Sequence, residues 1–308
     1  MGTLASSVQK QQEAAVARPL DAVAAAIVVV LCMSWGFNQV AVKLALPDVP
    51  PLLQATIRSV IAAVLVALWA RWRGISFSLR DGTLLPGLIA GALFGLEFVF
   101  IYRGLLWTTA SRAVLFIYLT PVLVAIGARW FLPGDRFRLS QWAGLALSFA
   151  GIALAFGLPA PAADPRQMLG DLMMICAAIS WAATTLVIKA STLNSARYEK
   201  TSLYQLVVSV VVLAVAALAF GESIVRAPSN LAIASLAYQS LWVASISYVV
   251  WFALVQRYSA SRLSAFTFLT PLFGVAAGHL VLDEPLTPAF AVAAALVAAG
   301  LVLVNRPR

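Results

Sequence analysis

Charged residues are scarce in this sequence: Asp, Glu, Lys and Arg make up 11% of its 308 residues, whereas a soluble domain carries roughly 25%. Hydrophobic residues make up 62%, and the mean hydropathy is +0.93. This composition excludes an ordinary water-soluble protein. A transmembrane helix needs about 20 mostly apolar residues, so the chain can supply on the order of ten spans, with little left for a soluble domain.

Histidine and cysteine are almost absent. His279 is the only histidine, which excludes a histidine-pair metal site and a histidine relay. The two cysteines, Cys32 and Cys176, lie in apolar runs and predict neither a disulfide framework nor a metal cluster. The sequence therefore predicts no metal and no cofactor.

Motifs for nucleotide binding and hydrolysis are also missing. No G-x4-G-K-[ST] occurs, so ATP is not expected to drive this chain. No G-x-S-x-G or H-E-x-x-H indicates an intramembrane protease. The net charge of +9 does not indicate a nucleic-acid partner, because basic residues between apolar runs set orientation in a bilayer. A secondary transporter is the leading hypothesis, and an intramembrane enzyme or a structural scaffold are the alternatives.

Breaks of proline, glycine and charge divide the chain into ten predicted membrane helices. They lie near residues 21–46, 50–70, 84–105, 109–132, 139–157, 168–192, 202–221, 231–256, 261–282 and 286–304. With the N-terminus inside, fifteen of the 21 Lys and Arg residues fall in cytoplasmic segments and five in outer segments. The positive-inside rule therefore predicts a multi-pass protein of the inner membrane with both termini in the cytoplasm.

The chain repeats itself after about 150 residues. The pattern S-R-x3-F-x2-L-T-P occurs at residues 111–121 and again at 261–271. Each half holds five spans, and because five is odd, the second half must enter the membrane inverted. Inverted repeats are a transporter architecture with the substrate site between the halves; a duplicated bundle without transport is the alternative. The predicted organisation is a cytoplasmic tail (1–20), a first repeat (21–157), an external linker (158–167), a second repeat (168–304) and a cytoplasmic C-terminus (305–308).

These features resemble the drug/metabolite transporter superfamily in its ten-helix EamA-type form. The resemblance spans the chain after residue 20 and is carried by Trp35-Gly36, by Ser259-Ala260-Ser261-Arg262 with Thr270-Pro271, by the copy of this motif in the fourth helix, and by Asp283-Glu284-Pro285-Leu286-Thr287. It implies export of small metabolites, and the overall appearance is similar to bacterial amino-acid exporters. Two departures show that the halves have diverged: Ala182 stands where the second half would repeat Gly36, and Arg136 rather than proline follows Asp135.

Two charged residues fall deep in apolar helices, where ionisable groups are expensive and are functional candidates. Glu97, in the third helix, either lines a cavity and binds an amine or a proton, or is a neutral structural acid bonded to another helix. Arg58, in the second helix, is either functional or a structural tie to a neighbouring carbonyl or carboxylate.

Aromatic and polar residues share faces of the helices that the repeat relates. Trp35, Asn38 and Gln39 lie on one face of the first helix, and Trp181, Thr184 and Thr185 lie on the equivalent face of the sixth. They either form opposite walls of a central cavity for an amphipathic ligand or are interfacial anchors and packing residues. The predicted substrate-binding residues are Trp35, Asn38, Gln39, Glu97, Tyr102, Trp181, Thr185, Tyr248 and Trp251, and the predicted hinge or gate residues are Pro121, Pro271 and His279.

The sequence as a whole thus predicts an all-helical membrane protein that exports small metabolites, foremost aromatic or other amphipathic amino acids, by alternating access. Export of drugs, cationic toxicants or other metabolites is the alternative. The expected partners are the small-molecule substrate and the lipid bilayer, with protons as a candidate coupling ion.

Overall fold

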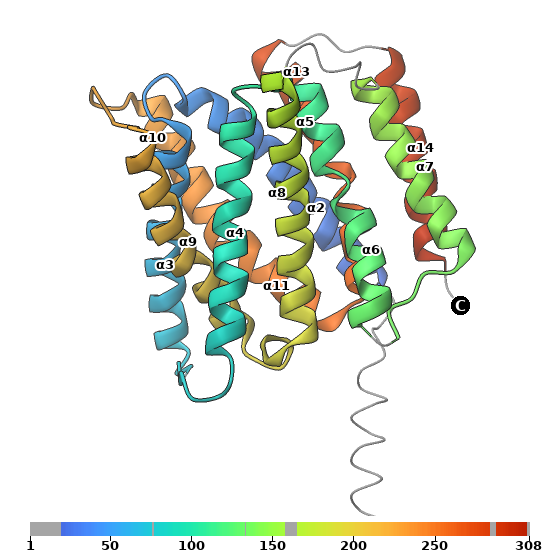
Figure 1. The fold of residues 1–308 in the computed structure, drawn as a ribbon, viewed down its shortest axis with the longest axis horizontal. Helices are drawn as coiled ribbons and strands as arrows, with labels where there is room; N and C mark the ends of the chain where they lie inside the picture. The colour runs from blue at the N-terminus through green and yellow to red at the C-terminus, as the bar shows by residue number, and fades with distance from the viewer. Residues whose placement is uncertain (1–19, 76, 133, 158–164, 284–287, 307–308) are drawn as a thin grey trace, which may run out of the picture.

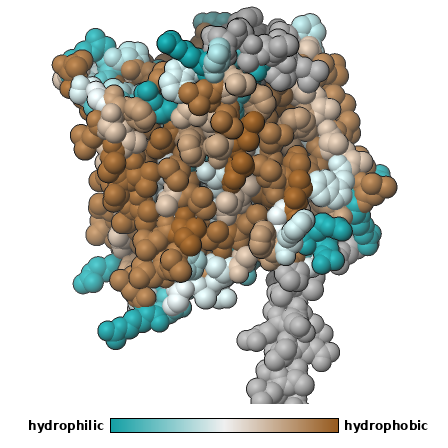
Figure 2. All heavy atoms as spheres, viewed as in Figure 1, coloured by the Kyte–Doolittle hydropathy of each residue, from teal (hydrophilic) through white to brown (hydrophobic). Residues whose placement is uncertain are grey.

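The computed structural model describes residues 20–75, 77–132, 134–157, 165–283 and 288–306, and every regular element in these ranges is helical. Ten stretches of helix are long and apolar enough to cross a membrane, which confirms the predicted fold class. The spans stand side by side (Figure 1). Hydrophobic residues form a wide belt around the middle of the visible face, and hydrophilic residues gather near its two ends (Figure 2).

The helices that make up these spans follow the chain order. They are α2 (Ala22–Ala45), α3 (Pro51–Trp72), α4 (Leu84–Gly104), α5 (Ala110–Ile117), α6 (Thr120–Phe131), α7 (Leu139–Phe156), α8 (Pro165–Ala190), α9 (Tyr198–Ala219), α10 (Asn230–Ala237), η2 (Tyr238–Ser247), α11 (Tyr248–Arg257), α12 (Ala260–Phe266), α13 (Leu269–Leu282) and α14 (Pro288–Asn305), with a short turn, η1 (Thr192–Asn194), before α9. The predicted tail is described only at residue 20 and the linker only from residue 165, while Glu284-Pro285-Leu286-Thr287 and residues 307–308 lie outside the described residues.

The fourth and ninth spans, predicted as single helices, are each divided into two by the Thr-Pro motif. Two residues separate α5 from α6, which has Pro121 in its first turn, and two residues separate α12 from α13, which contains Pro271. Proline has no N–H to continue the helix. In the fourth span the Thr120 hydroxyl donates 2.6 Å to the carbonyl of Ile117 and so bonds one of the freed carbonyls.

The eighth span contains a second departure from the predicted regular helix. Its middle, η2, is a π-helix of ten residues, a wider helix that is rare and often found at functional sites. The Ser245 hydroxyl donates 2.6 Å to the carbonyl of Ser240, five residues back. Serine hydroxyls can compete for helix carbonyls in this way, but no pattern in the sequence predicted a π-helix here.

The helix pairs follow the internal repeat. Helix α2 packs on α13, and its counterpart α8 packs on α6; α4 packs on α9, and their counterparts η2 and α3 pack together. Two further pairs, α3 with α9 and α7 with α14, join counterparts to each other. This pattern of contacts is the one expected of two inverted halves related by a pseudo-two-fold axis.

The axis passes through contacts that join equivalent residues. Ser209 lies 150 positions after Ser59, and their hydroxyl oxygens are 3.5 Å apart between α3 and α9. Ser148 donates 3.4 Å to the carbonyl of Val297, 149 positions later, between α7 and α14. These two contacts define an axis that runs through both self-paired sets of helices, α3 with α9 and α7 with α14.

Small residues let α7 and α14 approach closely on both sides of this axis. A Cβ atom on Gly300 would lie 2.5 Å from the carbonyl oxygen of Gly144, and a Cβ on Gly151 would lie 2.8 Å from that of Ala293. The two contacts are equivalent, because the internal repeat relates Gly300 to Gly151 and Gly144 to Ala293. Gly151 and Gly300, which occupy equivalent positions in the two repeats, are therefore packing positions.

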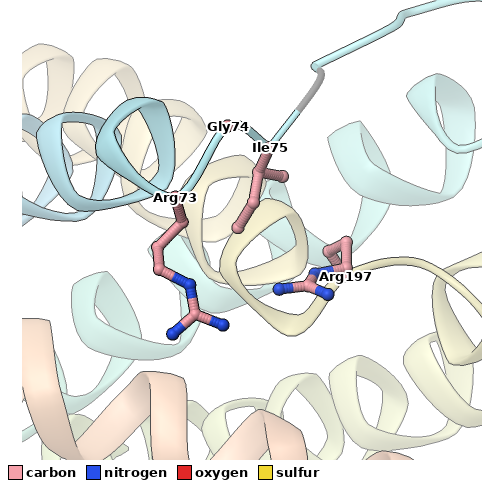
Figure 3. A pocket seen from close by; sticks show the side chains of 4 residues that line it. All are labelled: Arg73, Gly74, Ile75 and Arg197. Carbon is pink, nitrogen blue, oxygen red and sulfur yellow. The ribbon is translucent and has the colours of Figure 1, made fainter.

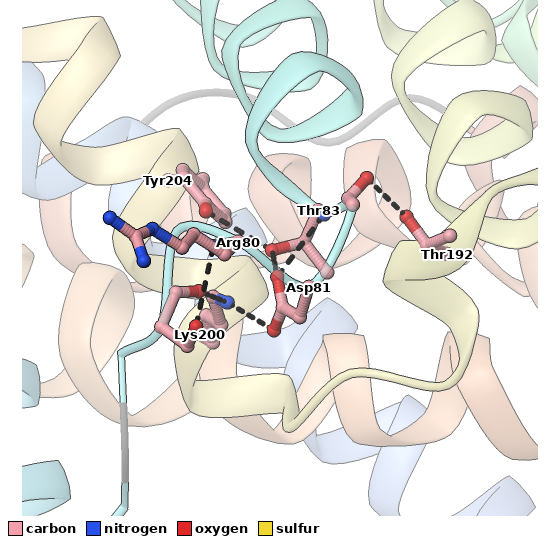
Figure 4. A network of polar contacts seen from close by, with 8 residues as sticks. Arg80, Asp81, Thr83, Thr192, Lys200 and Tyr204 are labelled. Carbon is pink, nitrogen blue, oxygen red and sulfur yellow. Dashed lines mark hydrogen bonds and ion pairs between the residues drawn. The ribbon is translucent and has the colours of Figure 1, made fainter.

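Each end of the bundle has an ion pair that ties one half to the other. At the end that carries the α3–α4 connection, Lys200 donates 2.6 Å to the carboxylate of Asp81, and Thr83 donates 2.6 Å to the same carboxylate (Figure 4). At the other end, Arg226 and Ser229 donate to Asp48. These hydrogen bonds stabilise the charged form, and they lower the pKa of Asp81 to about 2 and lower the pKa of Asp48 below its usual value.

Candidate functional site

Trp35 is held by the eighth span. Its indole N–H donates 2.9 Å to the hydroxyl of Ser247 at the end of η2, and its ring meets that of Trp251 edge-on with 5.2 Å between centroids. Trp251 is buried, whereas Trp35 is half-buried. Two predicted site residues from opposite halves are therefore brought together.

Trp181, the repeat counterpart of Trp35, has different neighbours. Its ring lies edge-on to Tyr118, with 6.3 Å between centroids, and Tyr118 in turn lies 6.2 Å from Phe268. The hydroxyl of Thr185 donates 3.2 Å to the carbonyl of Trp181, whereas the buried hydroxyl of Thr184 has no hydrogen-bond partner among the described residues. Trp181 thus joins a chain of rings between α8, α5 and the break before α13.

The two polar residues predicted beside Trp35 differ in burial. Asn38 is buried, and its side-chain oxygen has no hydrogen-bond partner in the described part of the chain. Gln39 is exposed. A helix turns by about 100° per residue, so neighbouring positions on a nominal face can fall on either side of a packing boundary. Asn38 is therefore the one of the pair that lies inside the bundle.

Glu97 lies inside the bundle beside a cluster of aromatic rings. The ring of Phe98 is 5.2 Å from that of Phe94 and 6.0 Å from that of Tyr102, and Phe94 is 5.4 Å from Tyr248 of α11. The predicted residues Tyr102 and Tyr248 thus belong to one cluster that spans both halves. We call Phe94, Phe98, Tyr102 and Tyr248 the aromatic cluster.

Arg58 of α3 packs against this cluster. Its guanidinium carbon lies 4.3 Å from the centroid of the Phe98 ring, and its charge interacts with Glu97 and with the hydroxyls of Tyr102 and Tyr248. A guanidinium over an aromatic face is attracted by the ring quadrupole. The structure therefore brings Arg58 and Glu97, the two charged residues predicted deep in the membrane, together beside the aromatic cluster.

Four residues of this region were not among the predicted substrate-binding residues: Arg58, Phe94, Phe98 and Ser247. Arg58 was weighed but not placed in the site, and Phe94 and Ser247 were not considered. A signal for Ser247 was present, because it lies 150 positions after Glu97, the same offset that relates Phe98 to Tyr248. Aligning the halves position by position would have found it.

The predicted hinge or gate residues belong to α6 and α13 and are not members of the aromatic cluster. Pro121 and Pro271 are buried at the starts of α6 and α13, where each broken span resumes. His279 is exposed in the last turn of α13. The prolines thus lie just after the breaks in the fourth and ninth spans, and His279 lies near an end of the bundle.

An open surface pocket of about 340 Å³ lies between the end of α3 and the start of α9. It is lined by Arg73, Gly74, Ile75 and Arg197 (Figure 3). None of the predicted substrate-binding residues lines it. Two arginines at the edge of the apolar belt are typical of residues at a membrane surface.

A polytopic helical protein with paired inverted halves and polar groups buried between them has the architecture of a secondary transporter. The sequence profile of the EamA-like transporter family matches this chain twice, at residues 22–157 and 168–306. The chain belongs to that family. This confirms the predicted family and the prediction of a multi-pass membrane transporter rather than an enzyme.

Similar proteins cover almost the whole chain. The uncharacterized transporter YvbV of Bacillus subtilis (strain 168) is 29% identical over 89% of each chain. A probable amino-acid metabolite efflux pump of Escherichia coli (strain K12) is 28% identical over 92% of this chain and 94% of its own. A solved crystal structure matches with a TM-score of 0.77 at 20% identity, over 90% of this chain and 95% of the other, which supports the fold alone.

Proposed function

We propose that this chain exports small amphipathic metabolites, foremost amino acids, from the cytoplasm by alternating access between its two halves. The proposal places it in the inner membrane with both termini inside. The halves, residues 21–157 and 168–304, move against each other around a midplane site. The buried carboxylate of Glu97 beside the aromatic cluster is the single observation that carries this proposal.

The surroundings of Glu97 support a binding role over a structural one. It is 6% exposed, and its Oε2 has no hydrogen-bond partner among the described residues. A structural acid in a membrane bundle would be bonded to another helix, since a buried polar group without a partner costs free energy. The site as predicted, with Trp35, Asn38, Trp181 and the residues around them, supplies aromatic surface and further polar atoms.

The efflux pump of Escherichia coli adds independent support, because its name describes amino-acid metabolites as its cargo. Export of cationic toxicants is a second candidate. A carboxylate beside aromatic faces suits a cation, which such faces attract by roughly 0.5–2 kcal/mol.

The test is counterflow in proteoliposomes. Purified protein is reconstituted into vesicles loaded with an unlabelled amino acid, and entry of the same labelled amino acid is followed for each of the twenty, with protein-free vesicles as the control. We expect transient accumulation for a subset with apolar side chains. Absence of counterflow for every amino acid would overturn the proposed cargo.

Glu97→Gln is the matched variant for the carboxylate. If Glu97 binds an amine or a proton, this variant should transport more slowly while remaining folded, and the dependence of flux on a pH gradient should shrink. Flux and pH dependence equal to those of the wild type would assign Glu97 to structure.

A further inference from the structure

We propose that Arg58 and Glu97 together bind a zwitterion, with the carboxylate of the substrate on Arg58, its ammonium group on Glu97 and its apolar side chain against the aromatic cluster. This inference rests on the proposed function and specifies the cargo as compounds that carry both charges on one end.

Arg58 is the first observation. It is 1% exposed, and its Nε and Nη2 atoms have no hydrogen-bond partner among the described residues. A guanidinium carries five N–H donors and stays charged in proteins, so its burial without acceptors is expensive. A planar carboxylate is the ligand whose geometry this group matches best.

Glu97 is the second observation. Its charge and that of Arg58 interact, yet in the described part of the chain no ion pair within 4.0 Å and no hydrogen bond joins them. Buried opposite charges in proteins are normally paired directly. Two such groups with unbonded atoms near one ring cluster indicate that a ligand completes both.

The second half of the chain supplies the third observation. At the positions 150 residues after Arg58 and Glu97 stand Val208 and Ser247. Val208 packs against Gly91 of α4, where a Cβ on the glycine would lie 2.6 Å from that of the valine, and Ser247 is bonded to Trp35. The same fold is therefore built in the second half without either charge, so the charges of the first half are not needed for packing.

The two charges also decide between ligand classes. A simple cation would be attracted by Glu97 and repelled by Arg58, and a simple anion would meet the reverse. A zwitterion satisfies both groups and brings no net charge into the membrane interior, where an uncompensated charge is costly. The rings of Phe94, Phe98 and Tyr248 then provide the surface for an apolar side chain.

The experiment uses the full-length wild-type protein in proteoliposomes. It compares three molecules that share one side chain and differ in which charged groups they carry. L-phenylalanine is compared with phenethylamine, which lacks the carboxylate, and with 3-phenylpropionate, which lacks the amine; L-leucine, isopentylamine and 4-methylpentanoate form the aliphatic set. We expect each analogue to compete with the labelled amino acid at least about tenfold more weakly than its parent amino acid does. A tenfold loss of affinity corresponds to ~1.4 kcal/mol.

Variants locate the two contacts. In Arg58→Gln the preference for phenylalanine over phenethylamine should fall to within about threefold, and in Glu97→Gln the preference for phenylalanine over 3-phenylpropionate should fall likewise. Arg58→Lys should retain part of the preference, since it retains the charge. The matched controls are Arg103→Gln, an arginine 3.8 Å over the ring of Phe220, and Glu199→Gln, a fully buried acid; both should leave the preferences unchanged.

The outcomes separate this inference from the proposed function. Wild-type transport of phenethylamine at least as well as phenylalanine would overturn the zwitterion and favour a cation exporter. Selective amino-acid transport with preferences unchanged in Arg58→Gln and Glu97→Gln would place the site elsewhere. Counterflow of none of the amino acids would contradict the proposed function itself.

Discussion

The two halves of this protein share their helix contacts but differ in chemistry at equivalent positions. In the second half, Ser247 accepts a hydrogen bond from Trp35. In the first half, Glu97 stands at the position of Ser247, and the indole N–H of Trp181 has no hydrogen bond among the described residues. The symmetric contacts build the scaffold, and the proposed substrate site uses positions at which the two halves differ.

The ties at the two ends show the same separation of geometry from chemistry. In one tie the acid, Asp81, lies in the connection between helices and the base, Lys200, near the start of α9. In the other tie the acid, Asp48, precedes α3 and the base, Arg226, lies in the connection. The contact is repeated with its charges exchanged, so position rather than residue identity is retained.

The largest expected effect is at a pair of acids 150 positions apart. Arg112 and Thr108 both donate to Asp171 in a buried ion pair, while Tyr258 donates to Asp21 at an exposed site. Asp171→Asn should lower the free energy of unfolding in detergent by about 3–5 kcal/mol, because it leaves a buried arginine without its partner charge. Asp21→Asn is the matched control and should unfold almost like the wild type; equal losses would contradict the comparison.

The scaffold glycines should respond alike in the two halves. Gly300→Val and Gly151→Val each force a side chain against a backbone carbonyl of the facing helix, so each should destabilise by about 1–3 kcal/mol. Ala299→Val, on the exposed side of α14, controls for the substitution itself. A large loss in one glycine variant and none in the other would show that the α7–α14 contact is not symmetric.

The two tryptophans should respond unequally. Trp35→Phe removes the hydrogen bond to Ser247 and should cost about 1 kcal/mol, the net worth of one such bond. Trp181→Phe removes no hydrogen bond to the described residues and should cost less. Melting temperatures of both variants in detergent check this difference, and Ser247→Ala should reproduce the effect of Trp35→Phe.

The smallest expected effect is the pH dependence of the Asp81 tie. Because the pKa of Asp81 in the folded chain is about 2, below the usual 3.8, its stabilising effect is fully present above pH 3.8 and is lost as the pH falls through 2. The difference in melting temperature between the wild type and Asp81→Asn should therefore vanish between about pH 4 and pH 2. In a Lys200→Met background, Asp81→Asn should change the melting temperature less at every pH, because the main donor to the carboxylate is already gone.

Much of the fold could be predicted because length and hydropathy define a membrane helix directly. The ends of the helices were harder to predict where tertiary contacts bury a charge. Helix α9 begins at Tyr198 rather than at residue 202, because Lys200 is bonded to Asp81 instead of facing water. Pro121 and Pro271 were predicted as hinge or gate residues without a complete break of the helix, whereas the π-helix depends on packing that no local pattern reports.

The candidate site could be predicted only in part. Buried charge identified Glu97, and periodicity placed Trp35 and Asn38 on one face of the first helix. Sequence alone did not show that no hydrogen bond joins Arg58 to Glu97 among the described residues, because hydrogen bonds between distant helices depend on the register of their packing. The proposed class of substrate rests on that observation.

Side-specific labelling tests most directly whether the aromatic cluster lies on an alternating-access path. In a background without Cys32 and Cys176, Tyr248→Cys is exposed to a membrane-impermeant thiol reagent in spheroplasts and in inside-out vesicles, with Ser195→Cys as the control. We expect Ser195→Cys to react only from the cytoplasmic side. Tyr248→Cys should react from both sides, more slowly when L-phenylalanine is present. Reaction of Tyr248→Cys from one side only, or at a rate that L-phenylalanine leaves unchanged, would contradict the account.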